Sequence, residues 1–119
     1  MMKVDLQAKP YSLDEAAIKW VKDTIEDMST EEKIGQLFIN MGSSRTEEYL
    51  TSVVNDYHIG GVRYNPAKSD EVYEQNRILQ ENSKIPLLIA ANTEMGGNGA
   101  STDGTYIGNE VKIAATNDP

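Results

Sequence analysis

The sequence lacks cysteine entirely and contains a single histidine among its 119 residues. Disulfide frameworks and metal sites built on thiolates are therefore excluded. The histidine, His58, has no second histidine and no cluster of carboxylates beside it in the sequence. Without such neighbours it does not form a metal-binding motif, and we interpret it as a surface or packing residue.

Long apolar runs and an excess of basic residues are also missing. No stretch approaches the ~20 consecutive apolar residues of a membrane-spanning helix, and residues 1–10 contain no apolar segment typical of a secretory signal. We therefore expect a cytoplasmic location. Acidic residues number 19 against 11 basic ones, so the formal net charge is -8. This charge argues against nucleic acid and anionic membranes as partners.

What is present is the composition of an ordinary globular protein, with 39% hydrophobic and 25% charged residues. A chain of this length accommodates one domain at most. Residues 1–11 are polar, and we interpret them as an extended arm. Residues 12–119 read as alternating helices and strands followed by a glycine-rich loop.

Capping boxes, in which a Ser or Thr precedes a Glu by three residues, predict where helices begin. The box at 12–15 predicts a helix with Ser12 as its N-cap and with Trp20 packed in the core. A second box at 29–32 opens a short helix, and a third at 44–47 opens a helix to about residue 56. A further helix begins near 69–71. The residues expected to be buried on the last two helices are Tyr49, Leu50, Val53, Val72, Tyr73, Ile78 and Leu79.

Three strands are predicted at 36–41, 60–64 and 86–91, about 25 residues apart. Strands that alternate with helices favour parallel pairing with right-handed crossovers. The third follows from an unbroken apolar run at 85–91, which predicts a strand buried on both faces. The expected architecture is therefore an α/β fold with three adjacent parallel strands in sequential order.

Polar residues follow the third strand directly, where α/β folds place their ligands. They are Asn92 and Glu94, and Gly96 and Gly97 after them let the backbone pass close to a ligand. Five of the nine glycines lie between 96 and 108, which predicts one long loop of functional importance. Arg63, inside the second strand, either points into the ligand site, or extends its apolar stem along the surface with its charge in water, or pairs with a neighbouring carboxylate.

Three segments, in the same order, resemble family 3 glycoside hydrolases. Residues 28–38 resemble the opening MTxEEKIGQLF, residues 57–62 the second strand xxIGGV, and residues 85–97 the segment IPLLIAxDxExGG. The resemblance covers about residues 17–119 and points to the N-terminal barrel domain of the β-N-acetylhexosaminidase and β-glucosidase group. The chain departs from the family at Asn92, where aspartate is usual, and it lacks the arginine that usually follows the glycines.

The resemblance implies a (β/α)₈ TIM-barrel glycosidase, of which this chain holds only the first ~3 βα units, since a complete barrel needs ~200–250 residues. It implies retaining hydrolysis of terminal β-linked N-acetylhexosaminides or glucosides, with no metal and no organic cofactor. The family's nucleophile and acid/base lie in later segments, so no catalytic residue is expected in this chain and the isolated chain is expected to be inactive. The residues expected to bind the carbohydrate substrate are Asn92, Glu94 and Arg63.

Two alternatives remain open from the residues alone. Glu94 and Asp103 could form the carboxylate pair that a retaining glycosidase needs, or they could be a structural carboxylate and a solvated loop residue. The chain could also be a non-catalytic fragment that folds only with itself or with a complementary chain. In either case three βα units leave strands uncovered, so the expected partner is the remainder of the barrel or a homo-oligomer. The expected interface residues are Leu37, Ile39, Val62, Leu88 and Ala90.

Overall fold

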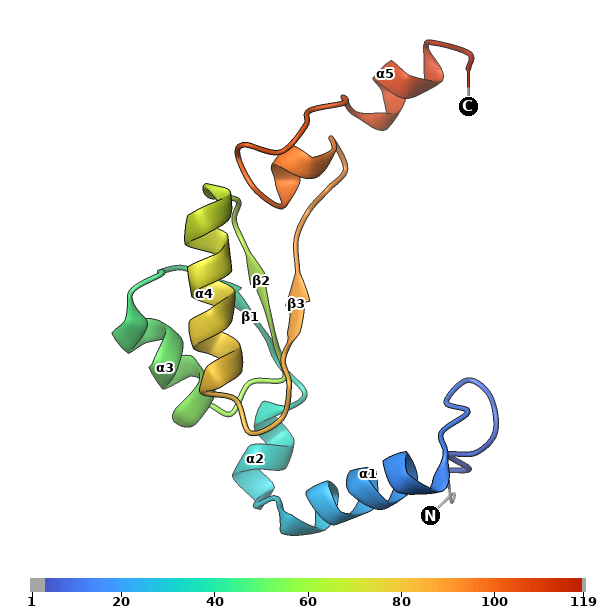
Figure 1. Ribbon diagram of the computed structural model, residues 1–119, viewed down its shortest axis with the longest axis vertical. Helices are drawn as coiled ribbons and strands as arrows, with labels where there is room; N and C mark the ends of the chain where they lie inside the picture. The colour runs from blue at the N-terminus through green and yellow to red at the C-terminus, as the bar shows by residue number, and fades with distance from the viewer. Residues whose placement is uncertain (1–3, 119) are drawn as a thin grey trace.

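The computed structural model describes residues 4–118 as a small parallel sheet with helices before, between and after its strands (Figure 1). The elements, in chain order, are α1 (Glu15–Asp27), α2 (Thr30–Gly35), β1 (Ile39–Gly42), α3 (Glu47–Asn55), β2 (Gly61–Tyr64), α4 (Ser69–Glu81), β3 (Leu88–Ala90), the 3₁₀ turn η1 (Gly97–Gly99) and α5 (Glu110–Ala114). No helix in these residues is long and apolar enough to cross a membrane.

The three strands are parallel and adjacent in the order β1-β2-β3, which confirms the predicted topology. Their bounds differ from those predicted. β1 begins three residues late because the amides of Leu37 and Phe38 donate back to carbonyls of α2. β3 begins at Leu88, because the Leu87 amide donates to the side chain of Gln80 on α4 (3.0 Å) and not to a neighbouring strand.

The helix starts are set by individual side chains. The capping box at Ser29 is confirmed, with both of its hydrogen bonds present. The predicted N-cap of α1 is wrong: Asp14 caps the helix by accepting from Ala17 (2.8 Å), while Ser12 adopts a positive φ of 49°. The third helix also begins later than predicted, because Thr46 rather than Ser44 accepts from the first turn.

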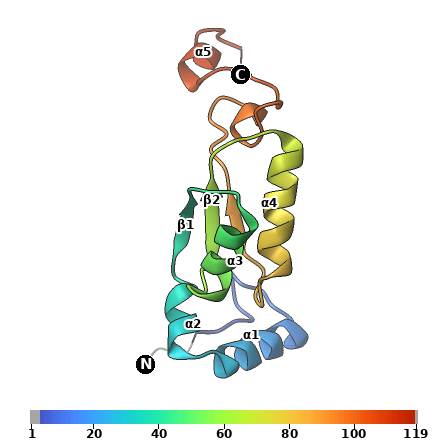
Figure 2. The same ribbon diagram turned by 90° about the vertical axis from the view of Figure 1, so that its left-hand side faces the viewer.

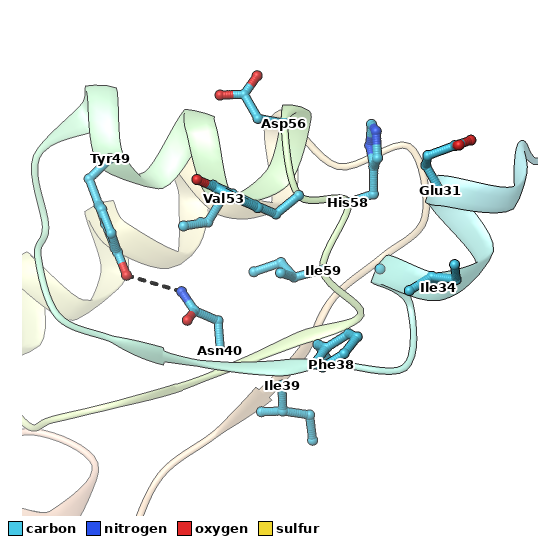
Figure 3. Close-up of a pocket in the computed structure, with 12 residues that line it drawn as sticks. Glu31, Ile34, Phe38, Ile39, Asn40, Tyr49, Val53, Asp56, His58 and Ile59 are labelled. Carbon is cyan, nitrogen blue, oxygen red and sulfur yellow. Dashed lines mark hydrogen bonds between the residues drawn. The ribbon is translucent and has the colours of Figure 1, made fainter.

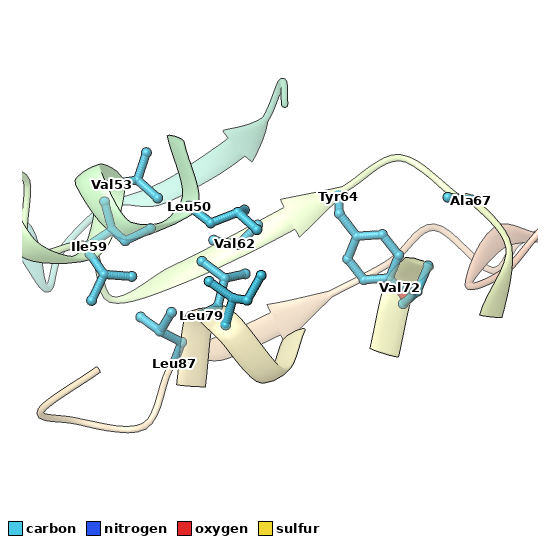
Figure 4. Packing of buried hydrophobic residues seen from close by; sticks show 11 residues of the cluster. Leu50, Val53, Ile59, Val62, Tyr64, Ala67, Val72, Leu79 and Leu87 are labelled. Atoms are coloured by element: carbon cyan, nitrogen blue, oxygen red, sulfur yellow. The ribbon is translucent and has the colours of Figure 1, made fainter. Parts of the chain in front are cut away.

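The hydrophobic core lies between the sheet and the helices α3 and α4, which cover the same face (Figures 1 and 2). Leu50 of α3, Val62 of β2 and Leu79 of α4 meet at its centre and are almost completely buried (Figure 4). Val62 was expected at an interface with another chain, and that prediction is wrong because its side chain points toward the helices. Tyr73, expected to be buried, is 71% exposed.

The opposite face of the sheet has no helix layer. We call this surface the open face; it consists of the residues that alternate with the core residues, Ile39, Met41, Gly61, Arg63, Leu88 and Ala90. Leu88 is 69% exposed and Ile39 57%. The prediction that β3 is buried on both faces is therefore wrong for the described residues, since only one face has a layer to cover it.

The N-terminal segment extends away from the sheet (Figure 1). Helix α1 buries none of its residues, and Trp20 is 54% exposed, so the predicted core packing of Trp20 is wrong. Residues 1–11 were expected to be an extended arm. Residues 6–11 instead form bends and turns, closed by hydrogen bonds such as Tyr11 to Ala8 (3.1 Å), and residues 1–3 lie outside the described part of the chain.

Candidate functional site

The carboxyl ends of β2 and β3 bring together two of the three predicted substrate-binding residues. Arg63 belongs to β2, and Asn92 follows β3 by two residues. The Nε of Arg63 donates to Oδ1 of Asn92 (3.3 Å), and its Nη1 donates to Oδ1 of Asn65 (2.8 Å). Arg63 pairs with two amides, so the alternative that it pairs with a carboxylate is not realised in the described residues.

Asn65 is a member of this cluster that the sequence analysis missed. It follows β2 immediately and is held from its other side by Arg45, which donates to its backbone carbonyl. The signal that identified Asn92, a polar residue just beyond a strand of the parallel sheet, applies equally to Asn65. We call Arg63, Asn65 and Asn92 the strand-end cluster.

Glu94, the third predicted residue, is exposed and takes no part in the hydrogen bonds of the strand-end cluster. Asp103 is exposed in the loop, as the second of the two alternatives has it, but its carboxylate is also hydrogen-bonded. Its carboxylate accepts from the backbone amide and the hydroxyl of Ser69 (3.2 and 2.7 Å), at the first residue of α4. The hydrogen bonds from Ser69 and Ser101 hold the pKa of the Asp103 carboxyl below its usual value.

These bonds attach the glycine-rich loop to the neighbouring βα connection. Beside Asp103, the amide of Thr102 donates to the carbonyl of Ala67 (2.7 Å). The loop also folds back on itself, with Gly96 bridged to Tyr106 and at a φ of 117°. A close approach of backbone to backbone occurs at Gly99, which the sequence analysis did not single out: a Cβ atom there would overlap the carbonyl of Asn92. The loop therefore rests directly on the backbone of the strand-end cluster.

A cavity of about 630 Å³ lies beside β1, between α2 and α3 (Figure 3). Its walls are mainly apolar, and its polar contact is a hydrogen bond from Asn40 to the Tyr49 hydroxyl (3.0 Å). Hydrogen bonds from Ser43 and Asn40 lower the pKa of Tyr49. His58 also lines this cavity, away from the strand-end cluster. No cluster of three or more potential metal ligands occurs in residues 4–118.

Comparison with known proteins relates the chain to enzymes that act on β-glycosides. A protein of Cellulomonas fimi, described as a β-N-acetylglucosaminidase/β-glucosidase, is 35% identical over 113 residues, which are 95% of this chain and 20% of that protein. The solved structure of the β-glucoside phosphorylase BglX bound to 2FGlc is 40% identical with a TM-score of 0.82, over 95% of this chain and 21% of that one. A second structure of BglX matches with a TM-score of 0.78. No family model matches the chain.

The resemblance to family 3 glycoside hydrolases is confirmed. The chain spans about one fifth of the length of the proteins that it matches. Its parallel α/β sheet is shared with the matching part of the phosphorylase. Within the family 3 resemblance, the strand-end cluster contains one of the chain's two departures from the usual pattern, because Asn92 stands where aspartate is usual. An amide can both donate and accept hydrogen bonds, so this position keeps a capacity to bind hydroxyl groups.

Proposed function

We propose that residues 1–119 form the first part of the (β/α)₈ barrel of a retaining glycosidase that acts on terminal β-linked glucosides or N-acetylhexosaminides. The observation that carries this proposal is the 40% identity and TM-score of 0.82 to a β-glucoside phosphorylase over 95% of the chain. The position of the strand-end cluster supports it, since barrel enzymes bind substrates at the carboxyl ends of their strands.

The open face supports the barrel in particular. Register pairs Ile39, Gly61 and Leu88 in one row across the three strands, and Met41, Arg63 and Ala90 in the next. In a (β/α)₈ barrel the side chains of such a face point inward and fill the interior. The apolar row lies toward the amino ends of the strands, and polarity increases toward Asn65 and Asn92. In the complete protein these rows would be covered by side chains of the remaining strands.

In this proposal the chain contributes substrate binding and no catalytic group. Retaining cleavage requires two carboxyl groups about 5–5.5 Å apart, one as nucleophile and one as acid/base. Asp103 is committed to Ser69, and Glu94 is not joined to the strand-end cluster, so the pair is expected from the segments that the family resemblance places later. Asn92 would bind sugar hydroxyls, with Arg63 holding its Oδ1 and Glu94 at the rim of the site.

Phosphorolysis is a second candidate reaction for the complete protein. It is favoured by one observation: the phosphorylase is 40% identical to this chain, whereas the β-N-acetylglucosaminidase/β-glucosidase is 35% identical. In both reactions the sugar is first transferred to the enzyme, and the two differ in whether water or phosphate then accepts it. The same binding residues serve either outcome.

The proposal is tested on the full-length protein that contains this sequence. Nitrophenyl β-glucoside and β-N-acetylglucosaminide should release nitrophenol, and proton NMR should show a first-formed product of β configuration. Asn92→Ala should lower kcat/KM roughly 10- to 100-fold, the cost of a lost hydrogen bond in a binding site, whereas Asn76→Ala on α4 should leave it unchanged. Inversion of configuration, or equal effects of the two variants, would contradict the proposal.

A further inference from the structure

Within residues 4–118, the positive charge of Arg63 has no carboxylate partner, and the rest of the open face is uncharged. The six open-face residues include no other ionisable side chain. Among residues 4–118, no carboxylate oxygen lies within 4.0 Å of its guanidinium. Arg77, on the outer helix α4, shows the contrast, because it is paired with both Glu74 and Glu81. In a chain of net charge -8, a half-buried arginine without a carboxylate partner requires an explanation.

The guanidinium is held in place while most of its donors remain available. Of its five N–H groups, one on Nε and one on Nη1 bond to the two asparagine oxygens. Asn65 is itself fixed, since Arg45 donates to its backbone carbonyl from outside the sheet. The remaining N–H groups form a planar fork, a geometry that matches the oxygens of a phosphate or carboxylate.

The two asparagines also suit an anion better than carboxylates would. A carboxylate at position 92 would neutralise Arg63 and repel a phosphate group at the short distances of the site. The amide adds no charge, and because its Oδ1 accepts from Arg63, its Nδ2 remains a donor. The same holds for Asn65. The strand-end cluster therefore presents one cation and amide donors, with no acidic group bonded to it.

We infer that Arg63, positioned by Asn65 and Asn92, binds inorganic phosphate at the carboxyl ends of β2 and β3. This inference rests on the proposed function and specifies the second substrate of the same site. The similarity to a β-glucoside phosphorylase shows that a related protein uses phosphate, and the strand-end cluster supplies the group in this chain that would hold it. The competing occupant of the fork is an acidic side chain from the rest of the polypeptide, which would exclude phosphate.

Phosphate titrations of the full-length protein separate these two outcomes. With nitrophenyl β-glucoside as the sugar donor and phosphorus NMR detecting sugar 1-phosphate, Arg63→Gln should raise the half-saturating phosphate concentration roughly 10- to 100-fold, as expected for a lost charge-assisted hydrogen bond. The half-saturating glucoside concentration should change much less. Arg63→Lys should lie between, since lysine keeps the charge but loses the fork. Arg77→Gln, the matched loss of an arginine on α4, should behave as the wild type.

Direct binding makes the inference independent of turnover. Broadening of the phosphate phosphorus signal by the protein should be seen with the wild type and be lost in Arg63→Gln. If the protein releases nitrophenol and free sugar but neither binds phosphate nor responds to it, this inference is wrong and the proposed function stands.

Absence of any nitrophenol release would contradict the proposed function. Phosphate binding that is lost in Arg63→Gln would still support the inference. Equal losses for phosphate and glucoside would also overturn it, because Arg63 would then only position Asn92.

Discussion

Gly99 determines how closely the glycine-rich loop approaches the strand-end cluster. A Cβ atom at this position would overlap the carbonyl group of Asn92, so no other residue fits without moving the loop or the strand end. At Gly97, two residues earlier, a Cβ atom would come no closer than 3.4 Å to its nearest neighbour, which is close to ordinary van der Waals contact. The two glycines lie in the same turn, but only Gly99 is at a position where no side chain fits.

We expect Gly99→Ala to displace Asn92 and to destabilise the loop by about 1–3 kcal/mol, the usual cost of overpacking. Gly97→Ala should have a much smaller effect. The measurement is the free energy of unfolding of the full-length protein by denaturant, together with the NMR signal of the Asn92 side-chain amide. Equal destabilisation by both variants would show that the loop does not rest on Asn92.

Asp103 gives the same loop a dependence on pH. Its folded-state pKa is lowered, first by the hydrogen bonds from Ser69 and then by that from Ser101. A lowered pKa means that the carboxylate stabilises the folded loop above its ordinary pKa, and that this contribution is lost as the pH falls through the folded value. The loop therefore loses this stabilisation in acid solution, at pH values below the usual pKa of aspartate.

We expect Asp103→Asn to lower the protection of the Ser69 amide against hydrogen exchange at neutral pH, because an amide oxygen is a weaker acceptor than a carboxylate. As the solution is acidified, this protection in the wild type should fall to that of the variant. Asp23→Asn on α1 is the control. Exchange that is identical at neutral pH would mean that Asp103 does not hold the loop.

At the residue scale, the place of a residue along a strand was enough to single out some site residues and not others. Asn92 was predicted because a polar residue just after a buried strand lies where α/β folds bind ligands, and Arg63 because a charge inside a strand could point into the ligand site; the structure brings the two together. The contact between Asp103 and Ser69 joins residues 34 positions apart through a loop, and no periodic pattern encodes how such a loop folds back. Local chemistry also misled: Ser12 fits a capping box, but Asp14 is the acceptor that the first turn uses.

At the scale of elements, the βα alternation predicted the parallel sheet and its strand order, but not the strand ends. The side chain of Gln80 explains the late start of β3, because it forms two hydrogen bonds with the backbone of Leu87 (both 3.0 Å) and substitutes for a neighbouring strand there. A glutamine on a helix has no sequence signature for this role. The apolar run at 85–91 likewise could not reveal that one face would lack a covering layer.

The packing of α4 on the sheet yields a prediction for Leu79. This side chain is completely buried between α4 and β2. Leu79→Ala should lower the free energy of unfolding by about 2–5 kcal/mol, through lost burial and the cavity that remains. Tyr73→Ala, on the exposed side of the same helix, should change it by no more than about 0.5 kcal/mol. Denaturant unfolding of both variants in the full-length protein checks this, and similar values for the two would place the helix in a different orientation.

The whole molecule is more extended than its length requires. Its radius of gyration is 18.1 Å, whereas a compact domain of this length has about 13.5 Å. Its accessible surface of 8760 Å² also exceeds the about 6,400 Å² of a compact protein of this mass. Helices α1 and α5 lie beyond the two ends of the sheet, and the open face is uncovered (Figures 1 and 2). The surface is large because three βα units lack the further strands and helices that would cover the open face.

The sequence predicted that some apolar strand residues need a covering partner, but one of the residues that it named was wrong. Leu37, Ile39 and Leu88 are exposed as expected, with Leu37 at 82%. Val62 was placed among them, although it lies at the centre of the core. Alternation along a strand defines two faces, so an Arg63 that points into the ligand site places its neighbour Val62 on the helix side, and the two expectations could not both hold.

The open face predicts how the isolated chain of 119 residues behaves in solution. Each exposed Leu or Ile forgoes roughly 1.5–3 kcal/mol of burial, a large part of the ~5–15 kcal/mol that stabilises a whole domain. We expect the wild-type chain to self-associate through this face and Leu88→Lys to shift it toward smaller species. Tyr73→Lys, an equally exposed position on the outer side of α4, should leave association unchanged. Sedimentation velocity over a tenfold dilution series measures both. A wild-type chain that stays monomeric when concentrated and melts cooperatively would show that the open face is stable in water without a partner.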